Sequence, residues 1–390
     1  MQTHAKNTPH MKLLGVLAGC AVALAAPVGR IVAPQSGGSR KPVAPPATIC
    51  DLSPASLAVI PGVVGDADPP YLRISDRPAA SELVIEVGPV DLPAHAMAEH
   101  SRELAYQLTY LPFDAWVHGH RVELVDAAGR RLPRELLHHI DTTRPAFREL
   151  FLPVPARFLA AGMDTKSQDL PAWLIGARIY RNEPLLVSTM LHNPTAKKYA
   201  GVRVRLVLPY TRTRPLLEVG GFYMDVKFPV GPKQFDLPAG RSLWTWEGSP
   251  AIPVTLIGVT GHLHRYAEWL ELRDVTSGKV IWRAVPDRDR TGRMTTMPVH
   301  FLRFGFGYRL KPTHTYRITA AYDNTSGRAI PEGGMAKFAG VVIPAGGAPW
   351  PRVDAADPLY SQDLGWMLAE PCASPLAARP RPAAIAYLRK

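Results

Sequence analysis

The chain has 390 residues, of which 46% are hydrophobic and 20% charged, so it is long enough for two domains with substantial cores. Forty prolines and 31 glycines exceed the roughly 12% that these two types usually supply, which argues against helical bundles and favours short strands joined by turns. Three cysteines exclude a dense disulfide scaffold. The net charge of +12 includes no basic run interleaved with aromatic residues, so we expect no nucleic-acid partner.

The N-terminus, residues 1–26, is predicted to be a signal peptide. Lys12 precedes an apolar run at 13–26 that is too short to span a bilayer, and the Ala-Leu-Ala at 23–25 is a cleavage-site pattern. Cys20 ends a Leu-Ala-Gly-Cys segment that also matches the lipobox of bacterial lipoproteins, in which the cysteine carries a lipid anchor. We therefore expect an exported protein, periplasmic or secreted, with an outer-membrane lipoprotein as the alternative and no transmembrane span.

The rest of the chain divides into flanks and a strand-rich body. Residues 27–80 are predicted to be a Pro/Ala-rich linker and lead-in, and residues 347–390 a Pro/Ala-rich tail. Strand-like runs lie at 82–87, 104–111, 122–125, 185–191 and 202–206, and then at 223–226, 242–246, 254–259, 269–272, 280–284, 316–322 and 338–343. Their spacing predicts an all-β protein of two tandem antiparallel β-sandwiches, jelly-roll-like, at 81–215 and 216–346.

Two further cysteines lie in these flanks. Cys50 and Cys372 are both in proline-rich surroundings outside the strand-like body. An oxidising compartment would permit a disulfide between them, and two free thiols are the alternative.

The histidines carry the most specific signal. His262 and His264 form a His-Leu-His segment after a strand-like run, and residues i and i+2 of a strand project from one face, so both rings can reach one ion. The neighbours His138 and His139 point to opposite faces of a regular strand, so they can share an ion only at a bend or strand end. His192 follows another strand-like run and precedes Asn-Pro.

Together with a methionine, these histidines resemble the ligand set of a known family, the type II ascorbate-dependent copper monooxygenases. The residues that carry the resemblance, in chain order, are His138, His139, His192, His262, His264 and Met335. In that family, which includes the peptidylglycine α-hydroxylating enzyme and dopamine β-monooxygenase, three histidines of a first β-sandwich bind one copper. A His-x-His pair and a methionine of a second sandwich bind another. The chain also resembles exported bacterial proteins with Met-Leu-His-Asn-Pro and Gly-His-Leu-His segments.

The resemblance implies two copper ions, one per domain, and a defined chemistry. Imidazole suits both oxidation states of copper, and the soft thioether of Met335 favours Cu(I). The implied activity is hydroxylation of an aliphatic C–H bond in an unknown small-molecule or peptide substrate, with dioxygen and ascorbate or another external reductant. The alternatives are a non-catalytic β-sandwich binding module and a copper carrier that uses one site. For Met335 itself, the alternative is an ordinary core methionine that fills a gap after a turn.

Some positions depart from the family pattern. Lys337, Ala339 and Thr260 stand where the amidating enzymes have an amide, a tyrosine and an arginine, so the family's grip on a peptide carboxylate is not reproduced. His118 and His120 form a second His-x-His segment, which is read as a hairpin or strand-end pair and competes as a source of first-domain ligands. Motifs of serine hydrolases, P-loop proteins and zinc proteases are absent from the sequence.

Overall fold

The computed structural model describes residues 72–95, 106–163, 165–229, 231, 233–290, 294–302 and 307–369. Within these ranges strands dominate and one α-helix occurs, α3 (Pro358–Ala369), which confirms the predicted all-β class. The predicted signal peptide, the lipobox Cys20, and Cys50 and Cys372 lie outside the described residues. No helix in the described part of the chain is both long and apolar enough to span a membrane.

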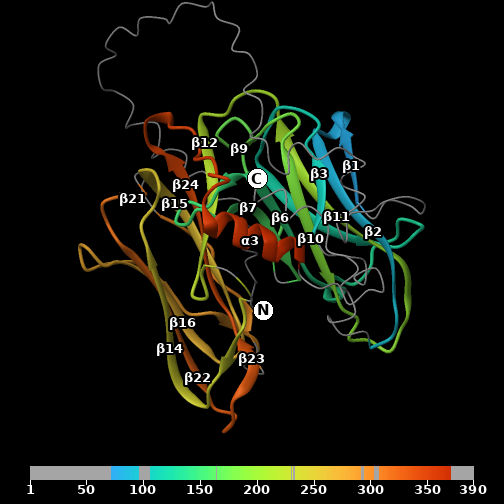
Figure 1. Ribbon diagram of the computed structural model, residues 1–390. Helices are drawn as coiled ribbons and strands as arrows, with labels where there is room; N and C mark the ends of the chain where they lie inside the picture. Colours follow the sequence, from blue (N-terminus) through green and yellow to red (C-terminus); the bar gives the residue numbers. More distant parts are fainter. Residues whose placement is uncertain are drawn as a thin grey trace, which may run out of the picture.

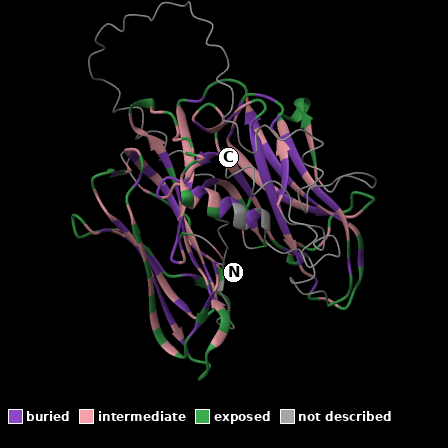
Figure 2. Cartoon of the chain, viewed as in Figure 1, coloured by how far each residue is buried: buried purple, intermediate pink, exposed green. Residues whose placement is uncertain are grey.

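The first sandwich packs two sheets around one core. One layer contains β1 (Leu72–Arg77), β2 (Glu82–Leu92), β11 (Tyr199–Thr211), β4 (Ala115–Val117), β5 (Gly119–Val125), β8 (Gln168–Asp169) and β9 (Ile175–Ile179). The other has the order β3 (Gln107–Tyr110), β10 (Pro184–Leu191), β6 (Leu137–Arg148), β7 (Pro155–Gly162). Apolar residues at every second position of these strands fill the space between the layers (Figure 2).

The second sandwich has the same two-layer construction. One layer contains β12 (Leu217–Asp225), β24 (Ala336–Pro344), β15 (Val254–Leu263), β20 (His300–Phe301) and β21 (Tyr308–Leu310). The other has the order β14 (Gly240–Gly248), β22 (Tyr316–Asn324), β16 (Ala267–Asp274), β17 (Lys279–Ala284). Two small pairs complete it: β13 (Phe235–Leu237) with β23 (Ile330–Gly334), and β18 (Asp287–Arg288) with β19 (Met294–Thr296).

A parallel strand pair joins the two sandwiches, which the sequence pattern did not predict. Strands β9 and β12 pair in parallel, with Leu217 opposite Ile175, so one layer of each sandwich belongs to a single 12-stranded sheet. The indole of Trp116 donates a 3.0 Å hydrogen bond to Glu218 beside this pair. The predicted boundary between residues 215 and 216 lies in the short link between β11, which ends at Thr211, and β12, which begins at Leu217.

The turn between β6 and β7 crosses from the first sandwich into the second. Leu150 and Phe151 are buried in the second core, and the backbone carbonyl of Leu150 accepts a 2.7 Å hydrogen bond from the amide of Ala251. Farther along, the guanidinium of Arg157 on β7 lies 5.4 Å from the ring centroid of Tyr223 on β12. The layer of the first sandwich that contains β6 and β7 thus faces the layer of the second that contains β12 across this contact (Figure 1).

Both predicted flanks contain ordered structure. The lead-in before residue 81 includes β1, which pairs along its length with β2. In the predicted tail, Trp350 donates to the carbonyl of Arg148, and α3 buries Tyr360, Leu364 and Met367. The predicted tail thus begins with ordered structure, because a few apolar residues amid the prolines and alanines suffice to dock α3 on the first sandwich.

Candidate metal centre

The pair His138–His139 lies at a β-bulge near the start of β6. Leu137 and Ile140 are both in the first core, 0% and 1% exposed, although a regular strand would send residues three apart to opposite faces. The register explains this: Met190 faces His139 and the next residue on β10 faces Leu137, so His138 is an extra residue without a partner. The bulge is a bend of the kind that His138 and His139 need if both are to bind one ion.

The rings of this first group contact one another. Nδ1 of His138 lies 2.9 Å from Nδ1 of His139, and the ring centroids of His138 and His192 are 5.8 Å apart. Nε2 of His139 lies 3.3 Å from Oδ2 of Asp141. If His139 keeps its proton on Nε2, toward the carboxylate, then its Nδ1 accepts and Nδ1 of His138 donates; binding of one ion by both Nδ1 atoms would require the proton of His138 to move to its Nε2.

The second group stands at the end of a strand ladder. His262 on β15 pairs with Lys337 on β24, and Leu263 pairs with Ala336 in the last rung. His264 and Met335 come directly after that rung, and the ring centroids of His262 and His264 are 5.4 Å apart. Because Leu263 and Ala336 point into the core, the histidines and Lys337 project from the opposite face, as the i, i+2 spacing predicted.

The two groups lie within electrostatic range of each other. The pKa of His138 is lowered to about 4, chiefly by burial and then by His139, His192 and His264. Burial likewise lowers the pKa of His262 to about 3, with further contributions from His264, Lys337 and the first-sandwich pair. Burial, helped by the histidines of the other sandwich, therefore keeps His138 and His262 neutral at neutral pH, and neutral imidazole is the form that binds metals.

A row of charged side chains extends from the second group across three strands. Lys337 is opposite His262 on one side and opposite Asp225 of β12 on the other. Asp225 is fully buried; burial raises the pKa of its carboxyl, while Lys337 acts to lower it. The cation of Lys337 is thus shared between a carboxylate and the histidines, and it contributes to the lowered pKa of His264, after burial.

The fit to copper differs between the two groups. Two nitrogens that bind one ion at 2.0–2.1 Å lie roughly 3 Å apart, which agrees with the 2.9 Å between the Nδ1 atoms of His138 and His139. Among the described residues, however, no three His, Cys, Asp or Glu side chains converge closely enough to hold a metal ion. His192 therefore lies beside the pair without completing a three-nitrogen site, whereas the second predicted set includes Met335, whose ligand would be a thioether.

The other candidates lie elsewhere. Nδ1 of His118 is 3.0 Å from Asp169 on β8, and His120 has its pKa lowered first by burial and then by Arg134. A hollow of about 480 Å³ lies on the outward layer of the second sandwich, where its lining includes Arg241 and Trp269 but none of the predicted ligands.

The sequence pattern did not identify two neighbours of the predicted ligands as parts of the site. Asp141 pairs with His139, and the hydroxyl of Tyr322 donates to the backbone carbonyl of Met335. Asp141 carries a weak sequence signal, since it follows His139 at i+2. Tyr322 carries none, because it arrives from the opposite sheet.

Comparisons with known proteins add little. No family model and no curated protein matches the chain. Among solved structures, the major capsid protein P2 of bacteriophage PM2 has a TM-score of 0.33 at 7% identity, over 67% of this chain and 97% of that chain. PNGF-II has a TM-score of 0.27 at 9% identity, over 70% of this chain and 60% of that chain. The VP2 subviral particle protein of infectious bursal disease virus reaches 0.22 at 10% identity, over 71% and 72%. These likenesses are too slight to extend any property of those proteins to this chain.

Proposed function

We propose that this chain is an exported copper protein that acts as a monooxygenase on an aliphatic C–H bond. The single observation that carries the proposal is that two histidine groups, one from each sandwich, lie within electrostatic range of each other. His264 contributes to the lowered pKa of His138, and His138 and His139 contribute to the lowered pKa of His262, although the two groups belong to different sandwiches. Structural histidines have no need of such an arrangement, since each can be satisfied within its own sandwich.

The donor types favour copper over harder metals. Imidazole nitrogens would hold one ion on the first sandwich, through His138, His139 and His192, and imidazoles with a thioether would hold another through His262, His264 and Met335. A thioether selects a soft ion such as Cu(I), whereas calcium and magnesium require oxygen ligands. Copper would supply the one-electron chemistry with dioxygen and with a reductant such as ascorbate. The protein's own part is to hold neutral imidazoles on facing layers.

The substrate belongs to a different class from that of the amidating enzymes. Lys337, Ala339 and Thr260 share the face of β15 and β24 that carries the histidines, since Thr260 is opposite Ala339 and His262 is opposite Lys337. One cation and two small side chains leave a less polar surface than an amide, a tyrosine and an arginine would. We therefore propose a small molecule or peptide that is not gripped by a carboxylate clamp.

A copper carrier is the second candidate function, and the difference in donor atoms between the two groups favours it. Among the described residues, no three His, Cys, Asp or Glu side chains converge closely enough to hold an ion. The second group alone combines two imidazoles with a sulfur. A carrier needs only that one site and no partner for electron exchange.

Total-metal analysis of the full chain, after loading with Cu(II) and removal of unbound copper, tests the proposal. We expect two copper ions per chain, and one in either double variant, H138A/H139A or H262A/H264A. Ascorbate-dependent oxygen uptake per bound copper should be lost in both. H300A is the control, because His300 is an exposed histidine on β20 that accepts a hydrogen bond from Trp282 outside both groups.

The outcomes separate the candidates. A chain that retains no copper would contradict both copper functions and leave the binding module. A single copper that disappears only in H262A/H264A, without oxygen uptake, would identify the carrier.

A further inference from the structure

The ladder between β15 and β24 stops one rung before the two ligands of the second group that follow it. Its last rungs are His262 with Lys337 and Leu263 with Ala336, so the next would pair His264 with Met335. That rung is replaced by a side chain. The backbone N–H of His264 donates to the hydroxyl of Tyr322 at 3.4 Å, and the same hydroxyl donates to the backbone carbonyl of Met335.

Tyr322 reaches this position through the core of the second sandwich. It belongs to β22, in the layer opposite β15 and β24, and it is 0% exposed. Its ring lies edge-on to Phe235, with 5.8 Å between centroids. A buried hydroxyl must find partners, and here its proton and its lone pair are both used, one on each of the two backbones that follow the ladder.

An inserted hydroxyl changes the distance between the two backbones. In a regular antiparallel rung the N–H and C=O bond directly, and the Cα atoms are about 5.5 Å apart. A bridging oxygen separates the same groups by two successive hydrogen bonds. The strands therefore part at His264 and Met335 while remaining tied to one fixed atom. Side chains that must approach a common ion from two strands gain room in this way without becoming free to move.

We propose that Tyr322 is a positioning residue of the second site, where its hydroxyl sets the separation of the backbones that carry His264 and Met335. The inference rests on the proposed function for the identity of the ion, but the hydroxyl bridge itself can be tested without metal. Nothing in the hydrogen bonds of Tyr322 requires copper.

The variant Y322F removes one oxygen atom and keeps the ring in the core. The matched control is Y316F, since Tyr316 lies on the same strand, is also 0% exposed, and uses its hydroxyl to accept a 2.8 Å hydrogen bond from the amide of Lys311. Both tyrosines have their pKa raised to about 12 by burial, so both hydroxyls are protonated at neutral pH. The two variants lose the same group at different places.

The metal-free measurement is hydrogen exchange at the backbone amide of His264, followed by NMR. We expect exchange at least tenfold faster in Y322F and unchanged in Y316F. Equal protection of the amide in the wild type and in Y322F would overturn the proposal, because the strands would then hold together without the hydroxyl.

The metal measurement uses the H138A/H139A background, in which only the second site remains. We expect Y322F to weaken Cu(I) binding at least tenfold and to reduce the sulfur contribution in X-ray absorption, with Y316F behaving like the background. Unchanged affinity and sulfur ligation would overturn the positioning role. If the background binds no copper, the proposed function fails, and the amide exchange alone decides the role of Tyr322.

Discussion

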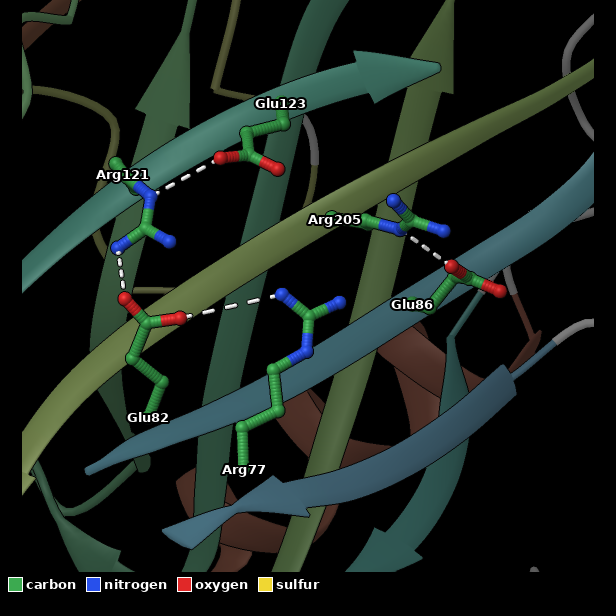
Figure 3. A network of polar contacts seen from close by, with 6 residues as sticks. All are labelled: Arg77, Glu82, Glu86, Arg121, Glu123 and Arg205. Carbon is green, nitrogen blue, oxygen red and sulfur yellow. Dashed lines mark hydrogen bonds and ion pairs between the residues drawn. The ribbon is translucent and has the colours of Figure 1, made fainter. Parts of the chain in front are cut away.

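The outer face of the first sandwich and the facing layers between the sandwiches differ in the state of their titratable side chains: paired charges on the outer face, and mostly uncharged groups on the facing layers. On the outer face, Arg121 bonds both Glu82 at 2.7 Å and Glu123 at 3.0 Å, and Arg205 bonds Glu86 at 2.6 Å, across β2, β5 and β11 (Figure 3). Each charge has a partner of opposite sign on the same strand, on a neighbouring strand or, for Arg121 and Glu82, across the intervening strand β11. Such a ladder stabilises the sheet and leaves no side chain available for chemistry.

The facing layers instead contain titratable groups that burial holds uncharged. His138 and His262 have lowered pKa values, and Glu149, which is 0% exposed, has its pKa raised to about 8 by burial. Some buried charge remains where a partner is close, as between Arg157 and Asp363 at 2.9 Å. The contrast teaches that buried, uncharged imidazoles, and not paired surface charges, mark where this protein has lone pairs available to bind a metal. Sequence composition gives no hint of it.

Among the variants considered, deletion of His138 is expected to have the largest effect, a loss of copper affinity at the first site. It removes the extra residue of the bulge, so that Leu137, His139 and Ile140 would alternate core, surface, core as a regular strand does. We expect a folded chain whose first site loses copper affinity by more than about 100-fold, beyond what the loss of a supporting residue usually costs. Copper titration measures this.

The control for the deletion is H138A, which keeps the bulge and removes one ring. It should weaken the first site less than the deletion does. A deletion variant that does not fold would show that the core requires the bulge. A deletion variant that keeps two tight copper sites would show that the first site does not require the bulge.

Glu149 should make the chain less stable as the pH rises. The unfolded carboxyl has its usual pKa near 4.5 and the folded one about 8, so between these values the folded state holds a proton that the unfolded state has released. The free energy of unfolding therefore falls between pH 5 and 8, by on the order of 3 kcal/mol. E149Q carries no charge and should lack this fall in urea unfolding at several pH values.

The histidines act in the opposite direction, which makes the difference between wild type and E149Q the quantity to measure. The lowered pKa values of His138 and His262 make the unfolded state bind more protons below pH 6.5, so stability is lost as the pH falls from 6.5 toward 4. If the two chains show parallel pH profiles above pH 5, the buried carboxyl is ionised in the folded state and the contrast between the faces is weaker than described.

The ion pairs on the outer face of the first sandwich should contribute least to stability. Arg205 and Glu86 are about one-quarter and one-sixth exposed, and pairs of this kind contribute about 0.5–1 kcal/mol. A double-mutant cycle with R205M and E86Q, measured by urea unfolding, should give a coupling energy in that range that decreases in high salt. Copper binding should not change. A coupling above about 2 kcal/mol would place this pair with the buried ones.

Much of the fold follows from local sequence pattern. Alternation at period two predicted strands such as 202–206 and 338–343, and turn residues separated them, because a half-buried strand requires that pattern wherever it lies. The local pattern did not predict the helix Pro358–Ala369, since docking of a short helix depends on the surface it meets.

The candidate site divides in the same way. The sequence by itself determined the donor types, and it placed His262 and His264 on one face through their i, i+2 spacing. Tertiary structure decided that His138 is the extra residue of a bulge, that the two groups face each other, and that Tyr322 bridges the end of the ladder. These depend on strand register and on contacts between distant segments, which cooperative packing selects and no local spacing encodes.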